Sequence, residues 1–312
     1  MGSHMLNVES TAGADVFGDG YSVFSSICNE VSRDFGNYKF KIMKDANFQK
    51  VMARDFKKSQ KIIWEELVYG SAYCSMISIM RSSYWIKGVL ESYENRNLFT
   101  YSSSLRSLIE CAGDSNHSLG RASYFWLQNI TLIKNAIKGK SAENIICEDL
   151  ENLLIHFEHG GSVRNKGQLS EMELPIEYLS LRSADYIESA SKVAGDDIQE
   201  LYKLLCGFVH PSNLTVWSFI EEEEKGAYYI YNNKDSSSEV LEVINKRYHT
   251  LICKILQHIN MPLVILKTLM QANVLRKNKF IMQLNLDSIE IVSPTGGWSL
   301  PLDAAKAVSS PG

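Results

Sequence analysis

Apolar residues recur at helical spacing through most of the chain between residues 21 and 280. The longest pattern covers residues 60–93, where apolar side chains occupy so much of the helix circumference that a central helix with several neighbours is predicted. The sequence therefore predicts a mainly α protein, built as a helical bundle. Further helices are expected at 98–112, 119–137, 143–158, 177–193, 201–209 and 240–275.

The periodicity changes after residue 213 and predicts a small β-hairpin near 214–232, appended to the bundle. Thr215, Trp217 and Phe219 alternate with other residues, and an aromatic run follows at 227–231. The acidic run Glu221–Glu224 is expected to form the solvated tip of this hairpin.

The two ends of the chain are expected to lie outside the helical domain of residues 21–280. Residues 1–20 begin with MGSHM, which is typical of a tag remnant, and continue without periodicity, so a flexible N-terminus is predicted. Residues 281–312 are predicted to form a C-terminal extension with a second short hairpin at 289–302 and a disordered tail.

Composition restricts the function classes. The chain has 312 residues, a net charge of −4 and a pI near 6.0, so there is no general attraction to nucleic acid or to an anionic membrane. The most apolar segment, 251–270, carries lysines, a histidine and a proline, and no membrane span is expected. The six cysteines lie in apolar runs without a Cys-x-x-Cys pair, which indicates free thiols in the cytoplasm. No metal site and no cofactor are expected.

The segment LYKLLCGFVHPSN, residues 201–213, is the strongest candidate for chemistry. Its apolar stripe predicts a helix that must stop at Pro211, because proline cannot continue the hydrogen-bonded ladder. His210 is thereby expected at the helix end, and histidine is the side chain suited to proton exchange near neutrality. The alternative is that His210 only caps the helix.

A second informative segment, SLRSLIE, places Arg106 and Glu110 four residues apart on one face of an otherwise apolar helix. One interpretation is an internal salt bridge that fixes helix packing. The other is an arginine that holds a phosphate or another anion, with Glu110 as its orienting partner. His156 and His159 lie three residues apart beside a Gly-Gly stop, and a solvated helix end is favoured over a metal pair.

Together, the two segments resemble a group of bacterial helical proteins related to the HEPN superfamily, over about residues 45–213. In that group an Arg-Ser-Leu-x-Glu helix precedes a Tyr-x-x-Leu-Ser/Cys-x-x-Val-His-Pro-Ser segment. The resemblance singles out Arg106, Glu110, Tyr202, His210 and Ser212. It implies a helical bundle, a homodimer, and a metal-independent ribonuclease of a toxin or antiphage system, with RNA or a nucleotide and a nearby-encoded protein as partners.

The chain departs from the HEPN nuclease motif, in which an arginine precedes the histidine by four to six residues on one helix. No arginine stands at that spacing before any histidine of this chain, and Lys203 lies seven residues before His210. Arg106, on another helix, is the candidate for the missing cation. Lys203 and Ser212 remain candidate ligand-binding residues.

Two functional hypotheses from different classes stay open. In the first, His210 is the general acid or base of a ribonuclease and Arg106 stabilises the phosphate. In the second, the bundle is a non-catalytic ligand-binding or protein-binding regulatory module in which Arg106, Glu110 and His210 form a buried polar network. If these polar positions serve one purpose, Arg106, Glu110, Tyr202 and His210 should converge on one cleft. If they are separate structural solutions, they should face different neighbours, with His210 pointing to solvent. Convergence is the prediction.

Overall fold

The computed structural model describes residues 5–34, 36, 41–140, 148–259 and 261–274. This part of the chain is mainly helical, with one two-stranded antiparallel sheet, as the sequence predicts. The first helices are α1 (Thr11–Phe17), α2 (Gly20–Asp34), α3 (Asp45–Met52), α4 (Phe56–Glu94), α5 (Leu98–Asp114), α6 (Arg121–Ile137) and α7 (Glu148–His159). The remaining elements are α8 (Lys166–Glu171), α9 (Ser183–Ala194), α10 (Asp197–Val209), α11 (Asn213–Trp217), β1 (Ile220–Lys225), β2 (Tyr228–Asn233), α12 (Ser237–His258) and α13 (Met261–Gln271).

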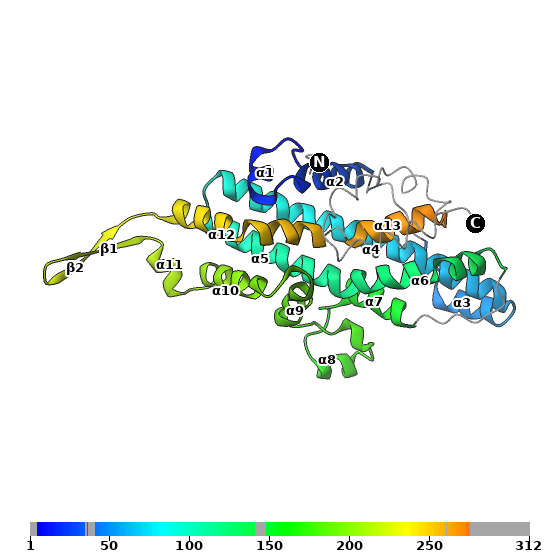
Figure 1. Cartoon of the computed structure of the whole chain (residues 1–312). Helices are drawn as coiled ribbons and strands as arrows, with labels where there is room; N and C mark the ends of the chain where they lie inside the picture. The colour runs from blue at the N-terminus through cyan, green and yellow to red at the C-terminus, as the bar shows by residue number, and fades with distance from the viewer. Residues whose placement is uncertain (1–4, 35, 37–40, 141–147, 260, 275–312) are drawn as a thin grey trace.

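The 39-residue helix α4 runs through the centre of the bundle (Figure 1). The side chain of Asp55 caps its first turn by accepting a hydrogen bond from the Lys58 amide. Its buried residues are spread around the helix, and it packs against α2, α5, α6, α7 and α13. The predicted central helix is therefore confirmed.

Helices α5 and α6 form one continuous rod. They are joined by a π-helical turn at Ser115–Gly120, and the residues at both junctions keep right-handed helical backbone angles. The sequence predicts two separate helices here, because the intervening GDSNHSLG is rich in residues that favour turns. A π-turn adds one residue per turn without leaving the helix. Periodicity therefore does not reveal it.

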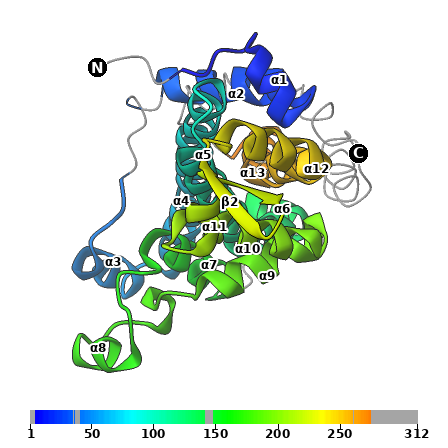
Figure 2. The same ribbon diagram turned by 90° about the vertical axis from the view of Figure 1, so that its left-hand side faces the viewer.

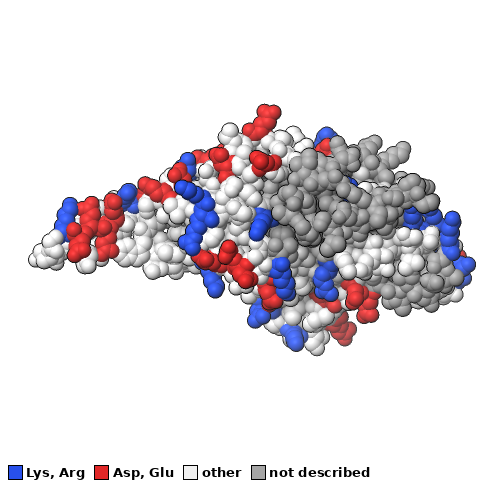
Figure 3. Space-filling model, in the orientation of Figure 1, with Lys and Arg blue, Asp and Glu red and all other residues white. Residues whose placement is uncertain are grey.

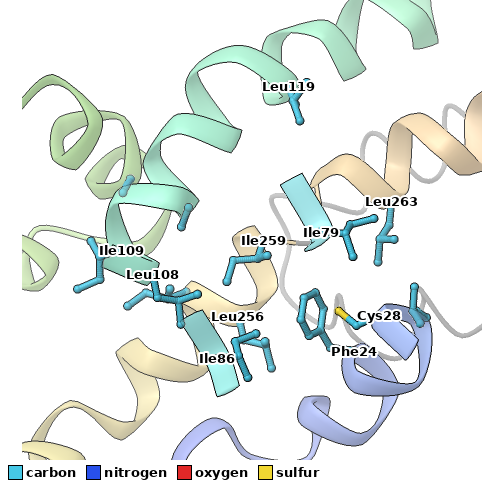
Figure 4. Close-up of a cluster of buried hydrophobic side chains, with 14 of the residues drawn as sticks. Phe24, Cys28, Ile79, Ile86, Leu108, Ile109, Leu119, Leu256, Ile259 and Leu263 are labelled. Carbon is cyan, nitrogen blue, oxygen red and sulfur yellow. The ribbon is translucent and has the colours of Figure 1, made fainter. Parts of the chain in front are cut away.

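The core lies where α4 and α5 meet the N-terminal and C-terminal helices. Helices α12 and α13 pack along α4, α5 and α6, and α1 and α2 pack against α4 and α12 (Figures 1 and 2). Helices α2, α4 and α5 and the C-terminal helices all contribute side chains to this core. Figure 4 shows Phe24 and Cys28 of α2, Ile79 and Ile86 of α4, Leu108 and Ile109 of α5, and Leu256 and Leu263 of the C-terminal helices.

The N-terminal segment differs from the flexible one that was predicted. Leu6 is buried, and the Asn29 side chain bonds both its amide and its carbonyl, each at 2.8 Å. Val16 and Phe17 of α1 are also in the core. A helix of seven residues is too short to show a clear apolar period, and its stability comes from packing. The expected tag remnant at residues 1–4 and the C-terminal extension lie outside the described residues.

The predicted hairpin is present, but its boundaries are shifted. The Thr215–Trp217 segment belongs to the short helix α11, and the acidic run is strand β1 itself, not the tip. The tip lies at Gly226, whose φ of 66° suits glycine. Within the described residues, no helix is long and apolar enough to cross a membrane.

Candidate functional site

Helix α10 presents His210 as predicted. Ile198, Leu201, Leu205 and Phe208 of α10 are buried. His210 is the C-cap residue, with extended backbone angles and its amide bonded to the Cys206 carbonyl at 3.0 Å. Its side chain is exposed, because the chain leaves the helix at this point.

The four residues Arg106, Glu110, Tyr202 and His210 converge across the α5–α10 interface. Nη1 of Arg106 lies 3.1 Å from Nε2 of His210, and Nε of Arg106 lies 3.7 Å from Oε1 of Glu110. The hydroxyl of Tyr202 donates to the Glu110 carboxylate, and the guanidinium lies over the Tyr202 ring at 5.9 Å. The four side chains are therefore in contact as predicted, but they do not share one cleft, because His210 and Glu110 line different ones. We call these four residues the α5–α10 cluster.

Hydrogen-bond chemistry assigns a role to each member of the cluster. A guanidinium only donates, so the contact with Arg106 requires Nε2 of His210 to accept and places the proton of the neutral ring on Nδ1. Burial raises the pKa of Tyr202 to about 12, and its hydrogen bond to Glu110 acts in the same direction. Tyr202 therefore remains a neutral donor that holds the carboxylate in place near neutral pH.

Burial of the charged pair is only partial. The side chains of Arg106 and Glu110 are 22% and 27% exposed. The apolar, fully desolvated setting that the sequence suggests is therefore not present, and the pair contributes on the order of 1 kcal/mol or less to stability. A partly open arginine also remains available to a ligand.

A groove of about 660 Å³ adjoins the cluster, and His210 is part of its wall. Trp85, which is 37% exposed, and Phe99 supply aromatic surface, while hydroxyl groups come from α5 and α11. Trp85 also lines a second cleft of about 340 Å³ that contains Glu110. The cluster therefore lies between two concave surfaces of the size that small ligands use.

The two candidate ligand-binding residues are not part of the cluster. Lys203 is exposed on α10, and none of the hydrogen bonds or ion pairs found in the described chain joins it to the other four. The hydroxyl of Ser212 donates to the Gly207 carbonyl, and its amide bonds the Thr215 hydroxyl at 3.2 Å. Ser212 thus serves the turn between α10 and α11.

Sequence reasoning missed a second polar cluster, formed by His117 of the π-helical turn, His156 of α7 and Tyr186 of α9. The rings of His117 and His156 are 5.5 Å apart, and the Tyr186 hydroxyl lies 3.4 Å from Nε2 of His156. Nδ1 of His156 lies 2.9 Å from the Glu177 carbonyl, so it donates there and leaves Nε2 to accept. We call these three residues the histidine cluster.

The helix end expected at His156 and His159 is present and the His159 side chain is 44% exposed, but His156 is less solvated than expected. His156 is half-buried in the cluster, and His159 stacks on Tyr178 with ring centroids 4.7 Å apart. Neither is part of a metal group, because the described residues contain no set of three or more His, Cys, Asp or Glu side chains that is suited to a metal ion. The sequence did not indicate a role for His117, because the residues of its π-helical turn have the composition of a loop.

The histidine cluster should make stability depend on pH. Burial lowers the pKa of His117, and the nearby His156 and Arg121 lower it further, against the opposite effect of Asp114 and Asp185. Just below the usual histidine pKa of about 6.5, the unfolded chain then binds more protons than the folded one, so stability falls as the pH falls. We expect the melting temperature to drop between about pH 7.5 and about pH 5.5.

The variant His117→Asn should show a smaller drop in melting temperature over the same pH range, because its side chain does not titrate. His159→Asn is the matched control, since His159 lies outside the cluster. An equal drop in wild type and His117→Asn would show that other groups cause the pH dependence.

Comparison of the chain with protein-family models, curated proteins and solved structures finds no match. The described chain is mainly helical, with a polar cluster beside an aromatic groove.

Proposed function

We propose that the chain is a HEPN-like, metal-independent ribonuclease that cleaves RNA in the groove beside the α5–α10 cluster. The observation that carries the proposal is the 3.1 Å contact between Nη1 of Arg106 and Nε2 of His210 at the groove wall. It pairs a proton acceptor with a fixed cation, the two groups that phosphodiester cleavage needs. The exposed Trp85 offers a face on which a base can stack.

Substrate binding would release His210 for proton transfer. A charged phosphate oxygen is a better acceptor for Arg106 than a neutral imidazole, so the guanidinium moves its hydrogen bond to the phosphate. Nε2 of His210 is then free to accept the proton of a ribose 2′-hydroxyl. The 2′-oxygen attacks phosphorus, the bond from phosphorus to the 5′-oxygen breaks, and that oxygen takes a proton from water. The products are a 2′,3′-cyclic phosphate and a 5′-hydroxyl.

Glu110 and Tyr202 act as positioning residues in this proposal. Glu110 and His210 contact different nitrogens of the guanidinium: Glu110 lies 3.7 Å from Nε of Arg106, and His210 contacts Nη1. The Tyr202 hydroxyl fixes the carboxylate, and its ring lies 5.9 Å from the centre of the guanidinium. These contacts limit the rotation of the Arg106 side chain. They leave part of its guanidinium group available to donate hydrogen bonds to the substrate.

A non-catalytic regulatory module is the second candidate. It is favoured by the ion pair between Arg106 and Glu110 and by the net charge of −4, since RNA binding usually relies on a positive surface. In that case the groove binds a small ligand or a protein segment, and the cluster fixes α5 against α10. The homodimer implied by the HEPN resemblance stays a prediction under either candidate.

Cleavage of single-stranded RNA tests the proposal directly. We expect wild type, in the presence of EDTA, to convert a labelled RNA oligonucleotide into fragments with 2′,3′-cyclic phosphate ends. DNA of the same sequence should stay intact, because it lacks the attacking 2′-hydroxyl. Intact RNA at high enzyme concentration would contradict the ribonuclease and favour the regulatory module. Equal cleavage of RNA and DNA would contradict the 2′-hydroxyl mechanism.

A further inference from the structure

The hairpin of β1 and β2 forms an arm that extends away from the helical body (Figure 1). All six residues of β2 are exposed, including Tyr229 at 62% and Tyr231 at 57%. An isolated two-stranded hairpin is only marginally stable in water, and aromatic residues normally contribute by being buried. So much exposed aromatic surface on an arm is typical of a binding surface.

The register of the hairpin gives the arm two different faces. One face carries Glu221 and Glu223, and both have a basic partner within the arm. Glu223 pairs with Lys225 at 2.9 Å, and Glu221 pairs with Lys234 at 3.5 Å. The charges of this face are therefore balanced.

The opposite face combines unbalanced acid with aromatic rings. Glu222 lies across from Tyr231 and Glu224 lies across from Tyr229, and the Trp217 ring is 5.9 Å from that of Tyr231. Among the described residues, no lysine or arginine forms an ion pair with Glu222 or Glu224. Figure 3 shows acidic side chains gathered on the arm. We call this surface the aromatic face.

We propose that the aromatic face docks a protein segment that carries arginine or lysine side chains. Tyrosine and tryptophan rings bind such cations through their faces, and adjacent carboxylates complete the contact by charge pairing. A second copy of the same face does not fit, because two carboxylates would meet two others. This docking is independent of the ribonuclease proposal.

The root of the arm lies beside the groove. Phe219, which precedes β1, stacks on Phe99 of α5 with ring centroids 5.8 Å apart. Phe99 and Thr215 both line the groove that contains His210. A basic partner that reaches the root of the arm would therefore approach that groove.

Binding of defined peptides to the full chain tests the docking surface. The probe is a fluorescein-labelled peptide of alternating glycine and arginine, and a glycine–glutamate peptide of equal length serves as the negative control. Fluorescence anisotropy is measured near 0.15 M salt, where screening beyond about 8 Å suppresses long-range attraction. We expect the arginine peptide to bind wild type and the glutamate peptide not to bind.

Two double variants remove the same charge from opposite faces. Glu222→Gln with Glu224→Gln should weaken binding of the arginine peptide about tenfold, because it removes the carboxylates beside the rings. Glu221→Gln with Glu223→Gln removes carboxylates that already have lysine partners and should change binding less than about twofold. A third variant, Tyr231→Leu, removes the ring without any change of charge and should weaken binding as well.

Several outcomes would overturn the proposal. Equal losses in the two double variants would show general attraction to net charge, and no binding by wild type at about 1 mM peptide would exclude a basic partner of this kind. Sedimentation of the same proteins checks for self-association. A dimer that dissociates in Tyr231→Leu, together with unaltered peptide binding, would assign the face to a second copy instead. Melting curves confirm that each variant is folded.

Discussion

His210→Asn should reduce RNA cleavage by about 10²- to 10⁴-fold, because the variant lacks the group that accepts the 2′-hydroxyl proton. Its folding should be nearly unaffected. The His210 side chain is exposed, so loss of its contact with Arg106 costs little stability. Initial cleavage rates and melting temperatures, measured on the same preparations, check both parts of the expectation.

Arg106→Gln should lower the cleavage rate by about 10²- to 10³-fold, since the uncharged amide cannot offset the charge that develops on the phosphate. The cost in stability should be on the order of 1 kcal/mol, because both partners of the ion pair are partly exposed. His159→Asn, at another helix end, is the control for histidine loss. Full activity in His210→Asn, or strong unfolding in Arg106→Gln with unchanged specific activity, would contradict the catalytic role.

The sequence was sufficient for α4, for α10 and for the residues of the α5–α10 cluster, whereas the single helix predicted at 240–275 is divided into α12 and α13. Apolar spacing in α4 and α10 reflects the faces that they bury, and such spacing is visible without coordinates. The Arg106–Glu110 pair and the proline after His210 are local features with a direct structural interpretation. The contact between Arg106 and His210 depends on the packing of α5 against α10. The sequence suggested this packing, and the structure confirms it.

Other parts of the fold depend on information that a local pattern does not contain. The π-turn places His117 against α7, and its six residues have the composition of a loop. The N-terminal helix α1 is stabilised by contacts with α4 and α12, which are distant in sequence. In β1 the glutamates have low strand propensity, and they adopt the strand because each faces a partner in β2.

Gly113→Ala should destabilise the protein strongly. Gly113 is buried in α5, and a Cβ atom at this position would lie 2.2 Å from the carbonyl oxygen of Tyr186 in α9. That oxygen belongs to a helical backbone, so no side-chain rotation relieves the clash. Helices α5 and α9 must separate, at an expected cost of about 2–4 kcal/mol in the free energy of unfolding.

Gly70→Ala in α4 is the matched control, since it adds the same methyl group within a helix. The nearest atom to its Cβ would be Cδ1 of Leu154 at 3.6 Å, which is an ordinary contact. Alanine is the better helix former, so Gly70→Ala should stabilise the protein by about 0.5–1 kcal/mol. Chemical denaturation of both variants should therefore give shifts of opposite sign. Stabilisation by Gly113→Ala would mean that α5 and α9 do not approach each other as closely as this packing requires.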